Sequence, residues 1–220
     1  HWQIISPDLT GQHPGAQRCD GDVQVADAAA CGYGVIFNIA PSPLSNALIW
    51  VGTDNGLVQL TRDAGVHWQD VTPPGLPHWA RVNTIDPSAL DASTAYVAAD
   101  NHRQDDFAPY AWRTHDGGKS WQPINAGLPR DHFLAVVRAD PLKRGLLYAG
   151  TDAGVYVSLD DGDHWQALQL NLPQAWVRDL LVHGNDPVAA TQGRALWVLD
   201  DVSPLRELAG LDDRTHLFAP

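Results

Sequence analysis

The residues in this sequence that could do acid–base chemistry are aspartates in two settings. Asp54 and Asp152 follow strand-like runs at matching positions in Gly-Thr-Asp-x-Gly turns, and Asp100 ends a third run in the same way. Asp105 and Asp106 lie in the polar stretch that follows Asp100. Two carboxyl groups about 5–10 Å apart across a cleft, one with a raised pKa, can hydrolyse a glycosidic bond. Asp105 or Asp106 paired with Asp54 or Asp152 would serve; the alternative is that each aspartate caps its own turn.

The stretch 100–109 is longer than the corresponding turns elsewhere and contains His102 and Arg103. An extended polar loop on a rigid scaffold is a common place for binding residues, although a solvated loop with local ion pairs fits the same composition. Aromatic residues begin the innermost strand-like runs at Tyr33, Trp79, Phe133 and Trp176. Such rings can stack on a ligand or fill the gap between neighbouring repeats. The residues that we expect to contact a ligand are Trp79, His102, Arg103, Asp105, Trp176 and Arg194.

Other chemistries lack their residue patterns. The sequence has no Gly-x-Ser-x-Gly turn for a serine hydrolase, no glycine-rich phosphate loop, and no histidine spacing typical of a transition-metal site. Calcium could bind the turn 160–163, which a self-capped turn explains equally well. A sialidase would need clustered arginines with a Tyr–Glu pair. The candidate arginines are Arg81, Arg103, Arg178 and Arg194, but the one glutamate, Glu207, falls in the last unit of the chain.

An eight-residue box of the form [Ser/Thr]-x-Asp-x-Gly-x-x-Trp occurs three times. Each box separates two strand-like runs, so we expect it to close a hairpin. Its Asp can accept backbone N–H groups, its Gly allows a positive φ, and its Trp buries a large surface beside the turn. The shared residues are Thr61, Asp63, Gly65 and Trp68; Thr114, Asp116, Gly118 and Trp121; and Ser158, Asp160, Gly162 and Trp165.

The boxes divide the chain into four similar units of four strand-like runs, with no helical periodicity of useful length. The repeat length fits one four-stranded blade of a β-propeller, an all-β fold. The units cover 33–72, 79–124, 133–168 and 176–208, and the last lacks a box and ends in a weak strand at 205–208. Residues 210–220 are expected to be a tail or linker.

His1-Trp2-Gln3 matches the end of each box, so residues 2–6 are expected to be an outer strand left over from a preceding blade. The chain is then a fragment of a larger propeller. Alternatively, the four units close by themselves, with residues 2–6 completing the fourth. If the ring stays open, its unpaired edge should associate with the remaining blades of the parent protein or with another copy.

Composition narrows the partners. The formal net charge is −12 and the only lysines are Lys119 and Lys143, which argues against nucleic acid and against an anionic membrane surface. No apolar run is long enough to span a bilayer. Cys19 and Cys31 are expected to form a disulfide if the protein is exported, and to remain thiols if it is cytosolic.

The box is identified as the Asp-box, also called the bacterial neuraminidase repeat. This resemblance implies a β-propeller in which each box joins the third and fourth strands of a blade, and it does not imply sialidase activity. More widely, runs such as 49–63, 94–100 and 190–201 resemble the propellers of large bacterial proteins labelled glycosyl-hydrolase-like, which are related to that of sortilin. Members of that group are exported and longer than this chain, and they supply no agreed catalytic residues.

Two hypotheses for the function follow from these observations. The first is a non-catalytic binding or scaffold module of an exported bacterial protein, which takes a glycan or a peptide on the face opposite the Asp-boxes and needs no cofactor. The second is a glycoside hydrolase whose active site is shared with blades upstream. The second requires a buried carboxyl close to another one in a cleft lined by aromatic residues.

Overall fold

The computed structural model describes residues 1–11, 31 and 34–209 and contains four antiparallel sheets in chain order. Three sheets have four strands and the last has three. The strands of the first two sheets are β1 (Ile36–Ser42), β2 (Ser45–Thr53), β3 (Val58–Thr61), β4 (Gln69–Asp70), β5 (Arg81–Pro87), β6 (Ala95–Asn101), β7 (Asp106–Thr114) and β8 (Gln122–Pro123). Those of the last two are β9 (Leu134–Ala139), β10 (Leu147–Thr151), β11 (Val155–Ser158), β12 (Gln166–Ala167), β13 (Val177–His183), β14 (Asp186–Thr191) and β15 (Leu196–Val198).

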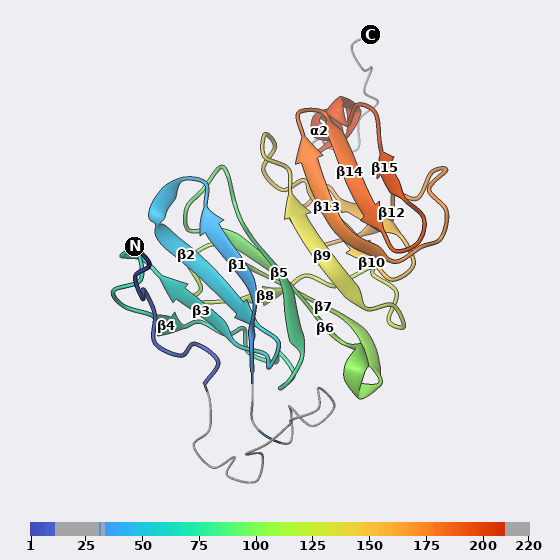
Figure 1. Cartoon of the computed structure of the whole chain (residues 1–220). Helices are drawn as coiled ribbons and strands as arrows, with labels where there is room; N and C mark the ends of the chain where they lie inside the picture. The colour runs from blue at the N-terminus through green and yellow to red at the C-terminus, as the bar shows by residue number, and fades with distance from the viewer. Residues whose placement is uncertain (12–30, 32–33, 210–220) are drawn as a thin grey trace.

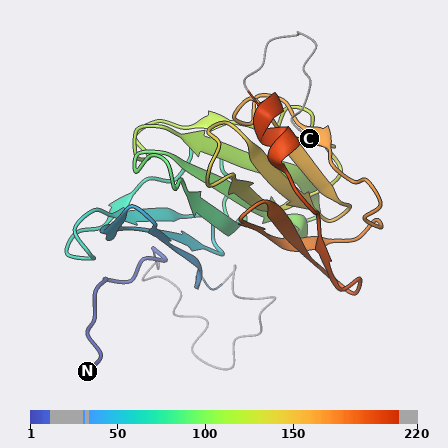
Figure 2. The same cartoon turned by 90° about the horizontal axis from the view of Figure 1, so that it is seen from above.

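Each sheet is a meander that begins near the middle of the molecule and runs outward, so the fold is that of β-propeller blades (Figure 1). The first strands β1, β5, β9 and β13 contact one another in succession. The sheets follow one another around this centre and stack face to face (Figure 2). The all-β propeller architecture predicted from the repeats is therefore confirmed. None of the described helices is long and apolar enough to cross a membrane.

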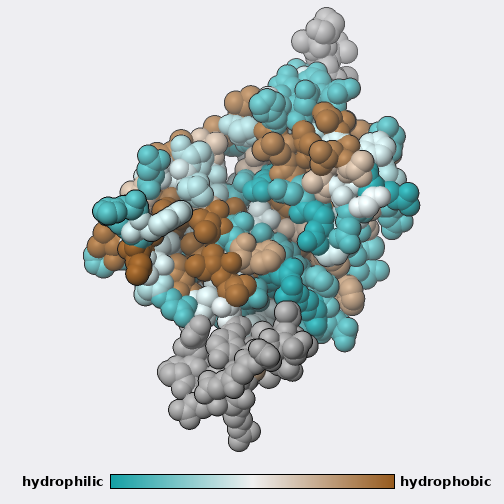
Figure 3. Space-filling view, in the orientation of Figure 1, coloured by the Kyte–Doolittle hydropathy of each residue, from teal (hydrophilic) through white to brown (hydrophobic). Residues whose placement is uncertain are grey.

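Apolar side chains fill the three gaps between successive sheets. Because the second and third sheets are covered on both faces, every residue of β6 is buried. The outer face of the first sheet has no neighbouring blade within the described chain, and Ile36 and Ile39 are 42% and 65% exposed. Hydrophobic residues gather on the surface over β1 in Figure 3. The main contacts in the three gaps are Trp50, Leu60, Val82 and Ile85; Tyr96, Leu134, Val137 and Leu147; and Tyr148, Val155, Val177 and Leu180.

The boxes are hairpin turns stabilised by their own side chains, as their residue types predict. In the second box the Thr114 hydroxyl donates to Asp116 Oδ1 at 2.9 Å and accepts the Gly118 N–H at 2.9 Å. Asp116 also accepts the N–H of Ser120 at 2.9 Å. The first and third boxes repeat these three bonds. The carboxylate and hydroxyl thus satisfy backbone N–H groups that the tight turn leaves without ladder partners.

Each box also fastens its blade to the preceding one. The Trp121 indole N–H donates to the carbonyl of Val71, which follows the outer strand of the first blade, at 2.7 Å. Trp165 bonds to Ile124 at 2.6 Å in the same way. The glycine allows this approach, because a Cβ on Gly118 would lie 2.9 Å from the Cβ of Val71.

The N-terminal segment occupies the equivalent place in front of the first box. Trp68 donates its indole N–H to the carbonyl of Ile5 at 2.9 Å, and a Cβ on Gly65 would lie 2.3 Å from the same oxygen. Ile5 therefore stands where Val71 and Ile124 stand in front of the later boxes. Residues 1–6 form no strand within the described chain, and Trp2 is fully exposed.

The fourth sheet differs from the prediction. The strand expected at 205–208 is wrong: Ser203–Leu208 form the helix α2 in place of a fourth strand. Pro204 lacks an N–H for a strand ladder and suits the first turn of a helix. With no box tryptophan here, Arg206 reaches back instead and donates from Nε to the buried Asp140 carboxylate at 2.9 Å.

The role of the box glycine can be isolated by a matched pair of alanine substitutions. Gly118 and Gly75 have nearly the same φ, +82° and +83°, but a Cβ on Gly75 would meet nothing within 4 Å. Both substitutions strain the turn, whereas Gly118→Ala also forces the second blade away from Val71. We expect Gly118→Ala to lower the free energy of unfolding in urea by at least about 1 kcal/mol more than Gly75→Ala. Equal losses of unfolding free energy in the two variants would show that Gly118 is needed only for the conformation of its own turn.

The box carboxylates make stability depend on pH in the acid range. Hydrogen bonds from the Ser120 hydroxyl and N–H hold the pKa of Asp116 at about 2, below its ordinary 3.8. A depressed folded-state pKa stabilises the fold above the ordinary value, and this contribution is lost as the pH falls towards about 2. Asp116→Asn removes the titrating group. Its thermal midpoint should therefore fall less steeply than that of the wild type across this range, and parallel curves would contradict the assignment.

Candidate functional site

Each innermost strand is interrupted at the same place, near the end that carries the long loop. The ladders between the first and second strands shift register by one residue in all four blades. A β-bulge of this kind redirects the side chain of the extra residue. The residues skipped by the ladders are Phe37, Asn83, Ala135 and Arg178.

The bulges build a small hollow at this end of the central channel. Its wall combines the four bulge residues with Arg81, Asp100 and Trp176, so all four blades contribute. The long loop lies beside it, because His102 of η2 (His102–Gln104) contacts the lining residues Asp100 and Trp176. This hollow is the candidate site, because it gathers two arginines, a carboxylate and two aromatic rings from segments distant in sequence.

The residues at the starts of the innermost strands are not the four aromatic residues expected from the sequence. The backbone N–H groups of Asp54, Asp152 and Gln192 donate to the carbonyls of Val35, Phe133 and Trp176. In the second blade Arg81 lies opposite Asp100 in the ladder between β5 and β6. The structurally equivalent residues are therefore Val35, Arg81, Phe133 and Trp176. Trp79 precedes this position by two residues, in a turn where its φ is +67°. Tyr33 lies outside the described residues.

His102 anchors the long loop in the site. Its Nδ1 lies 2.5 Å from Oδ1 of Asp100, a carboxylate that is 2% exposed. Asn83 donates its side-chain amide to the other oxygen of Asp100. The imidazole stacks on Phe133 with 4.3 Å between ring centroids, and Trp176 meets it edge-on at 5.7 Å. The carboxylate thus fixes the histidine and holds the loop against the channel.

The other loop residues named from the sequence point elsewhere. Arg103 and Asp105 are exposed, and Asp105 adopts a left-handed conformation that ends η2. Asp106 accepts hydrogen bonds from Tyr110 at 2.7 Å and Asn101 at 3.0 Å. Partial burial raises the pKa of Asp106, but these bonds outweigh it and leave that pKa below its ordinary value. Asp106 is therefore held as a carboxylate and does not suit the role of a general acid.

Asp54 and Asp152 have separate local partners. Asp54 accepts the N–H of Val35 at 2.7 Å, and Asp152 lies 2.9 Å from Nδ1 of His132. Neither of them lines the hollow. Burial raises the pKa of Asp86, but this group is paired with Arg138 at 3.1 Å, away from the loops. Each of these carboxylates is thus bound to a local partner of its own.

Trp176 and Arg178 belong to the site, whereas Arg194 does not line it. The Arg178 guanidinium lies 4.1 Å from the centroid of the Trp176 ring. Arg194 is exposed in the next turn, where its carbonyl accepts the Trp197 indole N–H at 2.6 Å. Phe37 and Asn83 were missed by the sequence reasoning, because a bulge position has no mark of its own in the sequence. The sequence signal for this site was Arg81, a charged residue at the position that Phe133 and Trp176 occupy in other repeats.

The turn considered for calcium is held together by protein groups. Asp160 binds His164, Asp161 accepts the Tyr96 hydroxyl at 2.6 Å, and Asp163 pairs with Arg113 at 2.7 Å. No three His, Cys, Asp or Glu side chains within the described residues are grouped as metal ligands. Cys31 is buried, and the predicted pairing with Cys19 involves a residue outside the described part of the chain.

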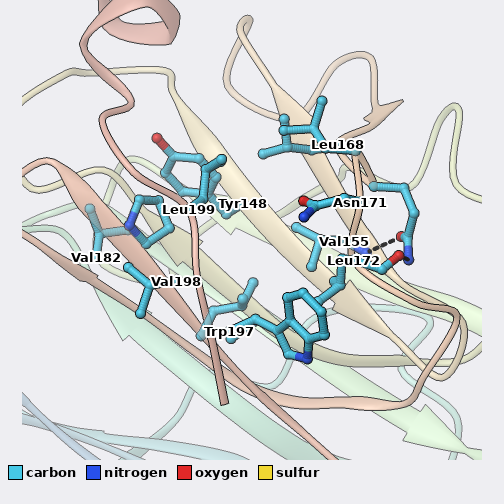
Figure 4. A pocket seen from close by; sticks show the side chains of 14 residues that line it. Tyr148, Val155, Leu168, Asn171, Leu172, Val182, Trp197, Val198 and Leu199 are labelled. Carbon is cyan, nitrogen blue, oxygen red and sulfur yellow. Dashed lines mark hydrogen bonds between the residues drawn. The ribbon is translucent and has the colours of Figure 1, made fainter. Parts of the chain in front are cut away.

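A second, apolar hollow lies between the third and fourth blades (Figure 4). Its wall includes Leu168, which follows β12 as Val71 follows β4 and Ile124 follows β8. In the earlier blades a box tryptophan packs at this position. The fourth blade has no box, so the hollow is the gap left by that missing side chain, lined by Tyr148, Val155, Leu172 and Trp197.

Comparisons with known proteins support the architecture. Neither protein-family models nor curated proteins gave a match. Among solved structures, YCF48 bound to D1 peptide aligns with a TM-score of 0.51 and 21% identity over 74% of this chain. The GH74 xyloglucanase from Xanthomonas campestris aligns with 0.55 and 18% over 78%, and the extracellular domain of BT4673 from B. thetaiotaomicron with 0.55 and 16% over 74%.

These similarities show the propeller fold alone, because the identities are low. The aligned part of this chain spans 54% of the YCF48 chain, 28% of the xyloglucanase and 21% of the BT4673 domain. Propellers of this kind thus include a protein solved with a peptide and a glycoside hydrolase.

The anchoring role of Asp100 predicts a stability difference between two equivalent aspartates. Asp100→Ala removes a buried carboxylate that binds both the amide of Asn83 and the ring of His102, whereas Asp54→Ala removes one bond from a half-buried turn. We expect Asp100→Ala to cost about 2–3 kcal/mol of unfolding free energy in urea and Asp54→Ala about 1 kcal/mol. Similar losses in both variants would show that Asp100 is an ordinary turn cap.

Proposed function

We propose that this chain is a non-catalytic binding module of an exported bacterial protein and that its ligand binds at the channel hollow opposite the Asp-boxes. The observation that carries the proposal is the convergence of charged and aromatic side chains from the first, second and fourth blades on one hollow, which Ala135 of the third blade completes. Convergent polar groups in a preformed concavity are typical of ligand sites. The long loop anchored by His102 gives this end of the channel its own shape.

A peptide suits the site better than a neutral glycan. Sugars stack on open ring faces, but here one face of each ring is already covered: Phe133 by His102, Trp176 by Arg178, and Phe37 by Arg81. The arginine side chains that line the hollow can donate N–H groups, which suit the carbonyl and carboxylate oxygens of a peptide. YCF48, a propeller of similar fold, has been solved with a bound peptide, which agrees with this choice.

The rival function is glycoside hydrolysis, as in the GH74 xyloglucanase of similar fold. It would need Asp54, Asp105, Asp106 or Asp152 to face a second carboxyl. The separate local partners of these residues argue against it. A catalytic pair completed by additional blades is the form of this function that a hydrolysis assay tests.

The exposed face of the first blade supports a proposal about assembly. Ile36 and Ile39 form part of an apolar surface on a sheet that in a propeller would contact another blade. We expect the remaining blades of the parent protein, or another copy of the chain, to cover it.

Binding can be tested on an array of short random-sequence peptides, with a panel of polysaccharides assayed for both binding and release of reducing ends. Trp176→Ala should weaken binding of the peptides selected on the wild type at least tenfold, because it removes a wall of the hollow. Trp68→Ala removes an equally half-buried tryptophan from the opposite face and is the matched control. Peptide binding unaffected by Trp176→Ala would move the site elsewhere, and reducing-end release abolished by Asp105→Asn or Asp54→Asn would establish the hydrolase instead.

A further inference from the structure

Arg81 is placed where its sister strands carry apolar side chains. The equivalent residues are Val35, Phe133 and Trp176. Arg81 is only 7% exposed, so its side chain is buried and not in solvent. A charged group seldom takes such a position unless an opposite charge or a full set of hydrogen-bond partners accompanies it.

The guanidinium of Arg81 lacks such partners. Its Nε and Nη2 atoms are buried and have no hydrogen-bond partner, and no ion pair joins it to any acidic residue of the described chain. Its one favourable neighbour is the ring of Phe37, whose centroid lies 4.6 Å from Cζ. The nearest carboxylate in the site, Asp100, is already bound by His102 and Asn83. The two unpaired N–H groups therefore need an acceptor that the described chain does not provide.

The two unpaired N–H groups form an edge of the guanidinium that can bind an oxyanion. Nε–H and Nη2–H lie along the same edge of the planar guanidinium and point in parallel, the geometry that binds both oxygens of one carboxylate. Arg178 lines the same hollow from the bulge of β13, resting on Trp176. Two guanidinium groups share one small space in a chain of net charge −12, and an anion between them would remove their mutual repulsion.

We propose that the hollow binds a carboxylate group of the peptide ligand, held by the Nε–Nη2 edge of Arg81 and the charge of Arg178. This assignment rests on the proposed peptide-binding function and names the chemical group that the site recognises. The ring edges of Phe37 and Trp176 border the group and exclude water, which strengthens the ion pair. Asp100, locked by its two partners, keeps Asn83 and the loop in place without entering the pair.

The anion site can be tested without knowing the peptide. Thermal unfolding of the wild type is followed with increasing sodium acetate, with sodium chloride at equal ionic strength and acetamide as references. Acetate should raise the midpoint in a saturable way, and acetamide should not, because it lacks the negative charge. Phosphate tests whether the site prefers the planar carboxylate. Saturation by chloride equal to that by acetate would overturn carboxylate recognition.

Arg81→Leu separates a binding role from a structural one. It restores an apolar side chain at this position, so the midpoint without ligand should stay the same or rise, while the acetate response disappears. Arg81→Lys keeps the charge without the planar edge and should weaken the acetate response at least tenfold in midpoint concentration. Arg144→Leu, on an exposed arginine bonded to Leu90, is the matched control and should keep the full response. A large drop in the ligand-free midpoint of Arg81→Leu, or a retained acetate response, would overturn the proposal.

Peptides selected by the array identify the source of the carboxylate. Each is synthesised with a free or amidated C-terminus and with Asp and Glu replaced by Asn and Gln. Loss of binding on amidation assigns the terminal carboxylate, and loss on side-chain replacement assigns an acidic residue. Peptides that bind equally in all forms would overturn the carboxylate assignment and leave the binding function standing. If acetate raises the midpoint but no peptide on the array binds, the carboxylate site would stand and the peptide-binding function would be overturned.

Discussion

The structure depends on one contact that the second and third boxes each make with the blade in front of them. The indole N–H of Trp121 and of Trp165 donates to a carbonyl just beyond the preceding outer strand, and a glycine lets the two backbones approach. The hydrogen bond contributes about 1 kcal/mol and the buried indole considerably more. A box therefore closes its own hairpin and also fixes the distance between two sheets, which positions everything nearer the channel.

That contact also explains the two ends of the described chain. Ile5 presents its carbonyl to Trp68 as if a blade stood in front, while the face of β1 that such a blade would cover exposes Ile36 and Ile39. At the other end the box is absent, a helix with Arg206 replaces the fourth strand, and a hollow remains beside Leu168. The two middle blades are covered on both faces, and every residue of β6 is buried.

The candidate site follows from a second regularity, the bulge in each innermost strand. A bulge redirects one side chain per blade into the channel, so four residues far apart in sequence meet in one hollow. The repeat determines where the side chains lie, and the chemistry of the site comes from residues that depart from the repeat. Arg81 occupies a position that is aromatic in the third and fourth blades, and the loop holding His102 is longer than the corresponding turns. Rigid blades can hold an arginine without a partner in the buried layer because the surrounding contacts fix its backbone.

The sequence alone determined the fold and its turns, because the spacing and residue types of the boxes act locally: Thr114, Asp116 and Gly118 satisfy one another within a few residues. It also indicated the long loop with His102 and the arginine at 81. Only the tertiary structure decided which side chains meet. The bulges shift the register by one residue in every blade and bring Phe37, Asn83, Ala135 and Arg178 to one hollow. Trp79 lies in the turn before β5, so Arg81 takes the position equivalent to Phe133 and Trp176, while Asp54 and Asp152 have local partners. Such a shift has no periodic signature in the chain, since side-chain direction depends on pairing between strands that are distant in sequence.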